Sequence, residues 1–204
     1  MKKSRSPSVQ KTIETRKKII HSALTHFLDV GFARAKIIDI AAKANLGKGT
    51  IYSYFETKEQ LFEGVIDYFL QDSLKMIQAN QIQDNQTVYE FIRNEMSVNI
   101  LSIESAGRAE IARLVLSEGQ TFPNIRDTYY KKIFFPVQIE LQQLTRLAIQ
   151  RKELPVEIEP EQFALLIVSP IWMGIIQNGL LSADILLDVN DLFLKNLKLL
   201  FQQI

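Results

Sequence analysis

Hydrogen-bond donors recur at close spacing in residues 48–58, KGTIYSYFETK. They alternate with Ile51 and Phe55, which a short helix would turn toward the protein interior. The donors left on its open side are Lys48, Thr50, Tyr52 and Tyr54. Ammonium and hydroxyl groups donate to phosphate oxygens and base edges, and tyrosine rings contact thymine methyl groups. The spacing predicts a helix that suits the major groove of DNA, with packing against the next helix as the alternative for both tyrosines.

The residues just before this segment have the spacing needed to position it. A helix over residues 37–44 would have one apolar face, formed by Ile37, Ile40, Ala41 and Ala44. Asn45 would form the turn, because Asn tolerates a positive φ better than any residue except Gly. Gly47 would serve as the N-cap of the second helix. Together these features predict a helix-turn-helix.

Further contacts to the phosphate backbone are expected around this unit. Lys58 begins the next helix, and Lys2, Lys3 and Arg5 could follow the backbone or the minor groove, with a solvated tail as the alternative. The complete set of predicted DNA-binding residues is Lys36, Lys48, Gly49, Thr50, Tyr52, Tyr54 and Lys58.

The net charge of +1 hides an asymmetry along the chain. Residues 1–60 contain 12 Lys and Arg but 5 Asp and Glu, whereas residues 61–204 contain 12 and 18. A basic head on an acidic body is expected when one end meets a polyanion, although a solvated basic face would give the same count. The chain contains no cysteine, which excludes disulfides, thiolate metal sites and thiol nucleophiles.

Hydrophobic periodicity predicts an all-α fold of about nine helices. After the first helix, which ends near Gly31, the expected helices cover residues 37–44, 48–55, 57–79, 87–106, 108–118, 124–152, 160–182 and 189–202. Thr57 and Gln60 have the spacing of a capping box. We expect a basic flexible tail over residues 1–12, a DNA-binding domain over 13–60 and a helical domain over 61–204.

One stretch, residues 162–183, contains no charged residue and is long enough to span a bilayer. Pro170, Gln177 and Asn178 interrupt it, and Glu161 and Asp184 flank it without a basic anchor. We interpret it as a buried core or interface helix, with no membrane as a partner.

Residues 16–62 resemble, without a gap, the N-terminal domain of the tetracycline-repressor (TetR) family. The shared residues are Phe27, Gly31–Phe32, Asp39–Ile40–Ala41, Gly49–Thr50–Ile51–Tyr52, Tyr54–Phe55 and Lys58–Glu59. Residues 113–130, RLVLSEGQTFPNIRDTYY, resemble a stretch of the body domains of this family. The resemblance implies a dimeric, all-helical repressor with a variable ligand-binding domain at its C-terminus. It also maps the DNA contacts of the family onto Lys48, Thr50, Tyr52, Tyr54 and Lys58.

The chain departs from the family pattern in three places. Ala35–Lys36 replaces the usual hydroxyl-bearing pair before the first helix of the motif, Asn45 replaces the turn glycine, and Ile38 replaces a polar or basic residue. The departures leave the operator sequence open.

For the body we predict an effector pocket and a dimer face. An effector pocket needs an apolar lining with a few polar groups, and it would take a largely hydrophobic small molecule. The pocket candidates are Phe91, Met96, Tyr129, Phe134, Trp172, Met173, Gln177 and Asn178. The candidates for half of a four-helix dimer interface are Leu166, Pro170, Val189, Leu192, Phe193, Leu197 and Leu200. Packing in the core of one subunit is the alternative for both sets.

Enzyme activity has little support in the sequence. His21 and His26 are five residues apart on one helix and do not share a face, and residues 47–50 lack the Gly and Ser/Thr positions of a phosphate-binding loop. We expect no cofactor. The function predicted is a cytoplasmic, homodimeric repressor that leaves a near-palindromic operator when it binds a small molecule. The alternatives are a regulator of this fold that has no effector or activates transcription, and a helical ligand-binding protein or enzyme.

Overall fold

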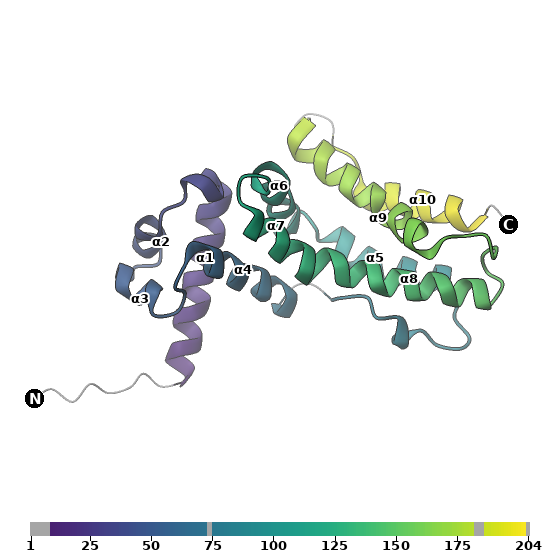
Figure 1. Cartoon of the computed structure of the whole chain (residues 1–204), viewed down its shortest axis with the longest axis horizontal. Helices are drawn as coiled ribbons and strands as arrows, with labels where there is room; N and C mark the ends of the chain where they lie inside the picture. Colours follow the sequence, from purple (N-terminus) through teal and green to yellow (C-terminus); the bar gives the residue numbers. More distant parts are fainter. Residues whose placement is uncertain (1–8, 73–74, 182–185, 203–204) are drawn as a thin grey trace, which may run out of the picture.

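The computed structural model describes residues 9–72, 75–181 and 186–202, and these residues form helices and connecting loops without a strand. Four helices form the N-terminal part, namely α1 (Val9–Arg34), α2 (Ile37–Lys43), α3 (Lys48–Tyr52) and α4 (Lys58–Asp72). They lie together at one end of an elongated molecule (Figure 1). The predicted all-α fold is confirmed.

The N-terminal helices pack around buried aromatic rings. Phe27 and Phe32 of α1 and Phe62 of α4 are fully buried, and their ring centroids lie 5.4 to 6.1 Å apart. Between the first two, Gly31 adopts φ 81°, which breaks the helical path within α1. Because only glycine adopts this conformation without strain, Gly31 lets the chain turn Phe32 back into the core.

The remaining helices form the body. They are η1 (Ala79–Gln81), α5 (Val88–Leu101), α6 (Arg108–Glu118), α7 (Pro123–Tyr129), η2 (Tyr130–Phe134), α8 (Phe135–Gln150), α9 (Pro160–Ile176), η3 (Gln177–Leu181) and α10 (Val189–Gln202). The single helix predicted over residues 124–152 is present as the continuous run α7–η2–α8, with a π-helical segment in its middle. The capping box at the start of α5, formed by Thr87 and Glu90, was not predicted.

Two large hydrophobic clusters and one small one, formed by Ala109, Ala112 and Ile175, make up the described core. The first joins α1 to α4 with Ile111, Leu114 and Val115 of α6 and Ile125 of α7. The second lies between α5, α8, α9 and α10. The boundary expected after residue 60 falls inside α4, whose next turns lie in the first cluster. The DNA-binding part therefore shares its core with α6 and α7.

Several ends also differ from the expected ones. Helix α1 begins at Val9, so residues 9–12 of the predicted tail are helical, while Lys2, Lys3 and Arg5 lie outside the described residues. Helix α4 ends at Asp72, before the predicted residue 79. Half of the predicted capping box is present, because the Thr57 hydroxyl accepts from the amide of Gln60 over 3.1 Å. The other half is shifted by one residue, because Gln60 Oε1 accepts from the amide of Glu56 and not of Thr57.

Helices α9 and α10 approach closely because α9 carries a glycine. A Cβ on Gly174 would lie 2.5 Å from Cγ2 of Val189. Pro170, inside α9, has no N–H to donate to the carbonyl of Leu166 one turn earlier. The side chain of Asn196 on α10 donates to this carbonyl over 2.9 Å. Because of the proline, the carbonyl of Leu166 remains available to accept the hydrogen bond from Asn196, which joins α10 to α9.

The predicted dimer stripe on α10 mostly faces the core of its own subunit. Val189, Phe193 and Leu197 are buried in the second cluster, Leu200 packs against it, and Pro170 is buried as well. Leu192 is half-buried. Of the predicted dimer residues, Leu166 is clearly accessible, at 50% exposure. The apolar stripe of α10 packs on α9 and the second cluster of its own subunit.

The α9–η3 run, residues Pro160–Leu181, is the one helix among the described residues that is long and apolar enough to cross a membrane. One side of α9 packs on α8 and α10, with Phe163, Ala164 and Ile167 in the second cluster. The run is 33% buried over its most apolar window, and its other side carries the exposed residues Leu165, Leu166 and Met173.

Candidate nucleic-acid interface and internal pocket

Helices α2 and α3 form the predicted helix-turn-helix. Asn45 has φ 51°, in the left-handed region expected of the turn, and Gly47 is the N-cap of α3 without a side-chain hydrogen bond. Ile40, Ala41, Ala44 and Ile51 are buried between the two helices and α1. The α-helical part of α3 ends at Tyr52 rather than residue 55, where the Ser53 hydroxyl donates back to the carbonyl of Thr50.

Most predicted DNA contacts lie on the open side of this unit. Lys36, Lys48, Gly49 and Tyr52 are exposed, and the ammonium of Lys48 lies 5.5 Å from the ring centroid of Tyr52. Thr50 and Tyr54 are half-buried, and Tyr54 packs against the first cluster. Tyr54 therefore shows the packing that was its alternative, while the Tyr52 side chain is open.

The side chain of Lys58 binds the protein backbone, whereas the sequence predicted a contact with a DNA phosphate. Its ammonium donates to the carbonyls of Phe32 and Ala35 over 2.6 and 3.1 Å, more weakly to Ala33 over 3.4 Å, and lies over the Phe32 ring. Burial lowers the pKa of this ammonium, while Glu59 and Glu118 act in the opposite direction. In this arrangement Lys58 holds the end of α1, and a phosphate contact would have to compete with these carbonyls.

A carboxylate from the body holds the same connection from the other side. Glu118, the last residue of α6, accepts from the amides of Phe32 and Ala33 over 2.9 and 2.6 Å. A Cβ on Gly31 would collide with Oε1 of Glu118, so the glycine also makes room for this contact. The segment that leads into the helix-turn-helix is thus bound both to α4 and to α6.

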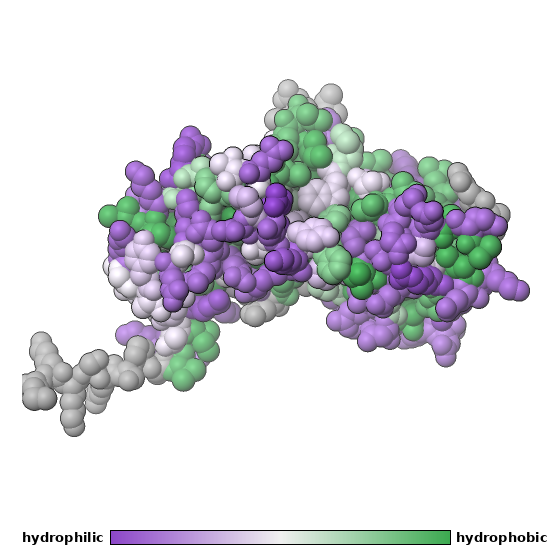
Figure 2. Space-filling model, in the orientation of Figure 1, coloured by the Kyte–Doolittle hydropathy of each residue, from purple (hydrophilic) through white to green (hydrophobic). Residues whose placement is uncertain are grey.

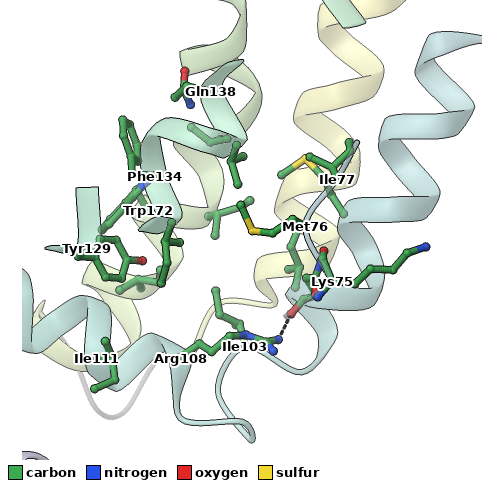
Figure 3. A pocket seen from close by; sticks show the side chains of 18 residues that line it. Lys75, Met76, Ile77, Ile103, Arg108, Ile111, Tyr129, Phe134, Gln138 and Trp172 are labelled. Carbon is green, nitrogen blue, oxygen red and sulfur yellow. Dashed lines mark hydrogen bonds between the residues drawn. The ribbon is translucent and has the colours of Figure 1, made fainter. Parts of the chain in front are cut away.

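The body contains a cavity of about 140 Å³ that is partly open to solvent. Its walls come from α5, α6, the α7–η2–α8 run, α9 and the segment of residues 75–77 (Figure 3). Four of the predicted pocket residues line it, namely Met96, Tyr129, Phe134 and Trp172. The Trp172 ring makes edge contacts with Tyr129 and Phe134, at centroid distances of 6.1 and 6.0 Å.

The other four predicted pocket residues do not line the cavity. Phe91 is buried in the second cluster, and Met173 is 43% exposed on the outer side of α9. Asn178 exchanges two hydrogen bonds with the backbone of Leu187, and its neighbour Gln177 lies with it in η3. An uncharged helix has several apolar faces, so the sequence could not tell which of them meets the cavity.

Apart from Tyr129, sequence reasoning missed the polar groups of the cavity. Arg108 begins α6 and donates to the carbonyl of Asn99 and to the Ser102 hydroxyl, over 2.6 and 2.8 Å. Burial lowers the pKa of Arg108, with Tyr129 acting against the shift. Burial raises the pKa of the Tyr129 hydroxyl well above its ordinary value, so this group stays protonated. A polar residue at the start of an otherwise amphipathic helix was the signal available.

The two histidines lie on α1 and have different neighbours, as expected for residues that do not share a face. His21 Nδ1 lies 3.0 Å from the carbonyl of Lys17, and His26 Nε2 lies 3.9 Å from a carboxylate oxygen of Asp39. Among the described residues, no group of three or more acidic or histidine side chains could hold a metal ion.

Comparisons with known proteins agree with this geometry. The family described as "Bacterial regulatory proteins, tetR family" matches residues 19–65. The uncharacterized HTH-type transcriptional regulator YhgD of Bacillus subtilis is 39% identical over 62 residues, 30% of this chain and 32% of YhgD. The match therefore spans about a third of that relative. YdeS of the same organism, another uncharacterized HTH-type regulator, is 22% identical over 90% of this chain and 85% of YdeS.

The same fold occurs in a solved structure, the transcriptional regulator FadR from Bacillus subtilis in complex with stearoyl-CoA. The TM-score is 0.71 at 21% sequence identity, with 92% of this chain and 98% of FadR covered.

The chain thus combines a helix-turn-helix with a helical body, and the two relatives from Bacillus subtilis are named as HTH-type transcriptional regulators. Over residues 19–65 the chain is similar to the tetR family of bacterial regulatory proteins.

Proposed function

We propose that this protein is a homodimeric repressor, located in the cytoplasm, which binds a near-palindromic operator and releases it when a small molecule enters the cavity. The observation that carries the proposal is that one helix, α6, joins the cavity to the helix-turn-helix. Arg108 and Ile111 line the cavity near its start, and Glu118 at its end binds the connection between α1 and α2.

The exposed face of the helix-turn-helix supports operator binding. Lys36, Lys48, Gly49 and Tyr52 present donors on one open side, and Thr50 and Tyr54 lie at its edge. In a two-fold dimer the two α3 helices would enter major grooves about 34–36 Å apart, or a multiple of this repeat. This geometry accounts for a near-palindromic site.

The outer side of α9 supports a dimer. Leu165 and Leu166 are each 50% exposed, and Met173, two turns on, is 43% exposed. Figure 2 shows hydrophobic surface continuing over the far end of α9 and η3. Because Asn196 binds the carbonyl of Leu166, Leu199 of α10, which is 62% exposed, lies beside this face. An uncharged, accessible helix face of this kind suits a self-complementary interface.

Two connections would transmit effector binding. Glu118 connects α6 to the end of α1, and Lys132 of η2 pairs with Glu63 and Asp67 of α4 over 2.9 and 2.5 Å. A shift of the cavity walls would therefore tilt both α1 and α4 and change the separation of the two α3 helices. Coupling of this type typically changes affinity by about 5–150-fold.

The first test is to recover genomic fragments bound by the purified protein and to sequence them. We expect an inverted repeat whose half-sites are spaced by a helical turn or a multiple of it. Binding should weaken steeply as salt rises, because several cations displace counterions from DNA. A monomeric protein, or one that ignores genomic DNA at low salt, would refute the proposal.

The alternative regulator without an effector, or one that activates transcription, differs in two measurements. Apolar compounds would not change the operator affinity of a regulator without an effector. Deletion of the gene of an activator would lower transcription from the bound promoter, whereas deletion of the gene of a repressor would raise it.

A further inference from the structure

The cavity contains a buried polar group that the protein leaves without a partner. Gln138 of α8 lines the cavity and is 5% exposed, and its amide Nε2 has no hydrogen-bond partner among the described residues. Within the described part of the chain, no other side chain of the cavity wall has a buried nitrogen or oxygen in this state. A buried N–H without an acceptor costs free energy, which an acceptor atom on a bound molecule would recover.

Three other polar side chains of the wall are bound to the protein itself. Lys75 extends away from the cavity in Figure 3 and pairs with Glu95 over 2.6 Å. The side chain of Asn99 exchanges two hydrogen bonds with the backbone of Lys75, over 2.7 and 3.3 Å. Arg108 donates to the carbonyl of Asn99 over 2.6 Å and lies across the cavity from Gln138. The acceptor for Gln138 therefore has to come from a molecule inside the cavity.

The wall beside Gln138 is aromatic. Phe134 lies four residues before Gln138 in the chain, and both line the cavity. The ring of Trp172 contacts those of Phe134 and Tyr129 edge-on. Figure 3 shows these rings along the same side of the cavity as Gln138. A flat apolar ring would pack well against such a wall.

A charged ligand would be unfavourable at this place. Among the described residues no acidic side chain lines the cavity, so a cation would have no counter-charge. A carboxylate at Gln138 would meet a single neutral donor between largely apolar walls. Burial of a charge without a charged partner costs far more free energy than burial of a neutral acceptor that receives a hydrogen bond. An uncharged acceptor such as a carbonyl oxygen therefore fits Gln138 best.

The volume of the cavity, about 140 Å³, limits the size of the molecule that it can enclose. An apolar protein cavity of about 150 Å³ holds one benzene molecule. We propose that the cavity binds an uncharged aromatic carbonyl compound, with its ring against Phe134 and Trp172 and its carbonyl oxygen at Gln138 Nε2. This inference rests on the proposed function, because it names the ligand class of the same cavity.

Acetophenone and isopropylbenzene test the role of the acceptor, because they have nearly the same shape and only acetophenone has a carbonyl oxygen. Calorimetric titration of the full-length protein gives the affinity for each compound. Because water also binds the free carbonyl, the informative quantity is the ratio of the affinity for acetophenone to that for isopropylbenzene. Gln138→Met keeps an unbranched side chain of similar length without the N–H, and we expect it to lower this ratio about tenfold.

Two controls locate the effect and its charge dependence. Gln143→Met should leave the ratio unchanged, because Gln143 is exposed on α8 and absent from the cavity wall. Benzoate, the charged counterpart, should bind the unaltered protein at least about tenfold less tightly than acetophenone. If Gln138→Met does not fold, NMR of the unaltered protein decides. Acetophenone should move a side-chain amide proton of Gln138 downfield through the hydrogen bond, and isopropylbenzene should not.

An unchanged ratio in Gln138→Met, the absence of the downfield shift, tighter binding of benzoate or no binding of acetophenone would each overturn the inference. Operator release is measured separately. Acetophenone that binds through Gln138 without releasing DNA supports the ligand class and refutes the release mechanism. Release of DNA only by compounds whose binding does not depend on Gln138 does the reverse.

Discussion

The connection between α1 and α2 is held by two residues of opposite charge. Glu118 binds its amides from the side of α6, and Lys58 binds its carbonyls from the start of α4. Each of these bonds is charge-assisted, and such bonds are stronger than neutral ones. The side chains of Glu118 and Lys58 thus bind backbone amides and carbonyls that lose their helical hydrogen-bond partners where Gly31 interrupts α1.

Glu118→Gln should weaken the communication between the cavity and DNA. The amide can accept from one backbone N–H in place of two and carries no charge, so we expect a loss of about 1–3 kcal/mol in stability. The ratio of operator affinities without and with effector should fall toward one. Urea unfolding and a DNA-binding titration measure the two effects. Glu157→Gln, in an exposed loop, is the control; an unchanged ratio in Glu118→Gln would assign the coupling to Lys132 and α4 instead.

Lys48→Ala and Tyr54→Phe should each weaken operator binding by about tenfold, because each removes a donor to a phosphate or a base edge. Lys48→Ala should also reduce the slope of log affinity against log salt by about one. Anisotropy titrations at several salt concentrations give both values, and size-exclusion chromatography should show an intact dimer. Arg126→Ala controls for loss of a surface cation. Full affinity in both variants would remove these residues from the interface.

At this scale the sequence was informative where the backbone itself imposes a residue type. The positive φ at Asn45 and the glycine N-cap at Gly47 followed from local conformational preferences. The role of Lys58 did not, because its carbonyl partners lie more than twenty residues away along the chain. The role of Glu118 could not be predicted either, because nothing in the neighbouring sequence distinguishes it from a solvated glutamate at the end of a helix.

Helices α9 and α10 show how one apolar pattern can be explained in two ways. The period of α10 predicted a helix buried on more than one side, which the structure contains. It could not tell whether the covering surface belongs to the same subunit or to a partner, because hydrophobic burial has no direction. Gly174 and Pro170 were the local signs of close contact within the subunit.

Gly174→Val should destabilise the body through overpacking. The added side chain would meet Val189 where a Cβ alone already lies 2.5 Å from Cγ2, and overpacking costs about 1–3 kcal/mol. The double variant Gly174→Val/Val189→Ala should recover part of this loss, since it restores the space. Thermal and urea unfolding of the four proteins give the coupling energy. Additive losses would show that these two side chains do not compete.

The elongated molecule presents its two candidate interfaces at different ends. The helix-turn-helix occupies one end and the exposed face of α9 belongs to the body (Figure 1). Only a fixed body can hold two α3 helices at a constant spacing. Operator affinity should therefore depend on residues far from DNA.

Leu166→Glu should yield a monomer, because it places one charge from each subunit at the proposed α9 interface. Each monomer would then bind one half-site by itself. The affinity for the complete operator should therefore fall by at least about tenfold relative to the dimer. Light scattering and a DNA titration measure the two effects. Leu101→Glu is the matched control, since Leu101 is 71% exposed on α5. A dimeric Leu166→Glu variant would place the interface elsewhere.

The first cluster joins the N-terminal helices to α6 and α7, and this limits which segments of the chain can be exchanged with those of another protein. Ile111, Leu114 and Val115 of α6 and Ile125 of α7 fill the base of the helices that read DNA. A chimera that exchanges residues 1–60 alone would bring foreign side chains against these four and leave voids or collisions. A functional graft of new operator specificity should either carry α6 and α7 with it or replace only the exposed side chains of α3.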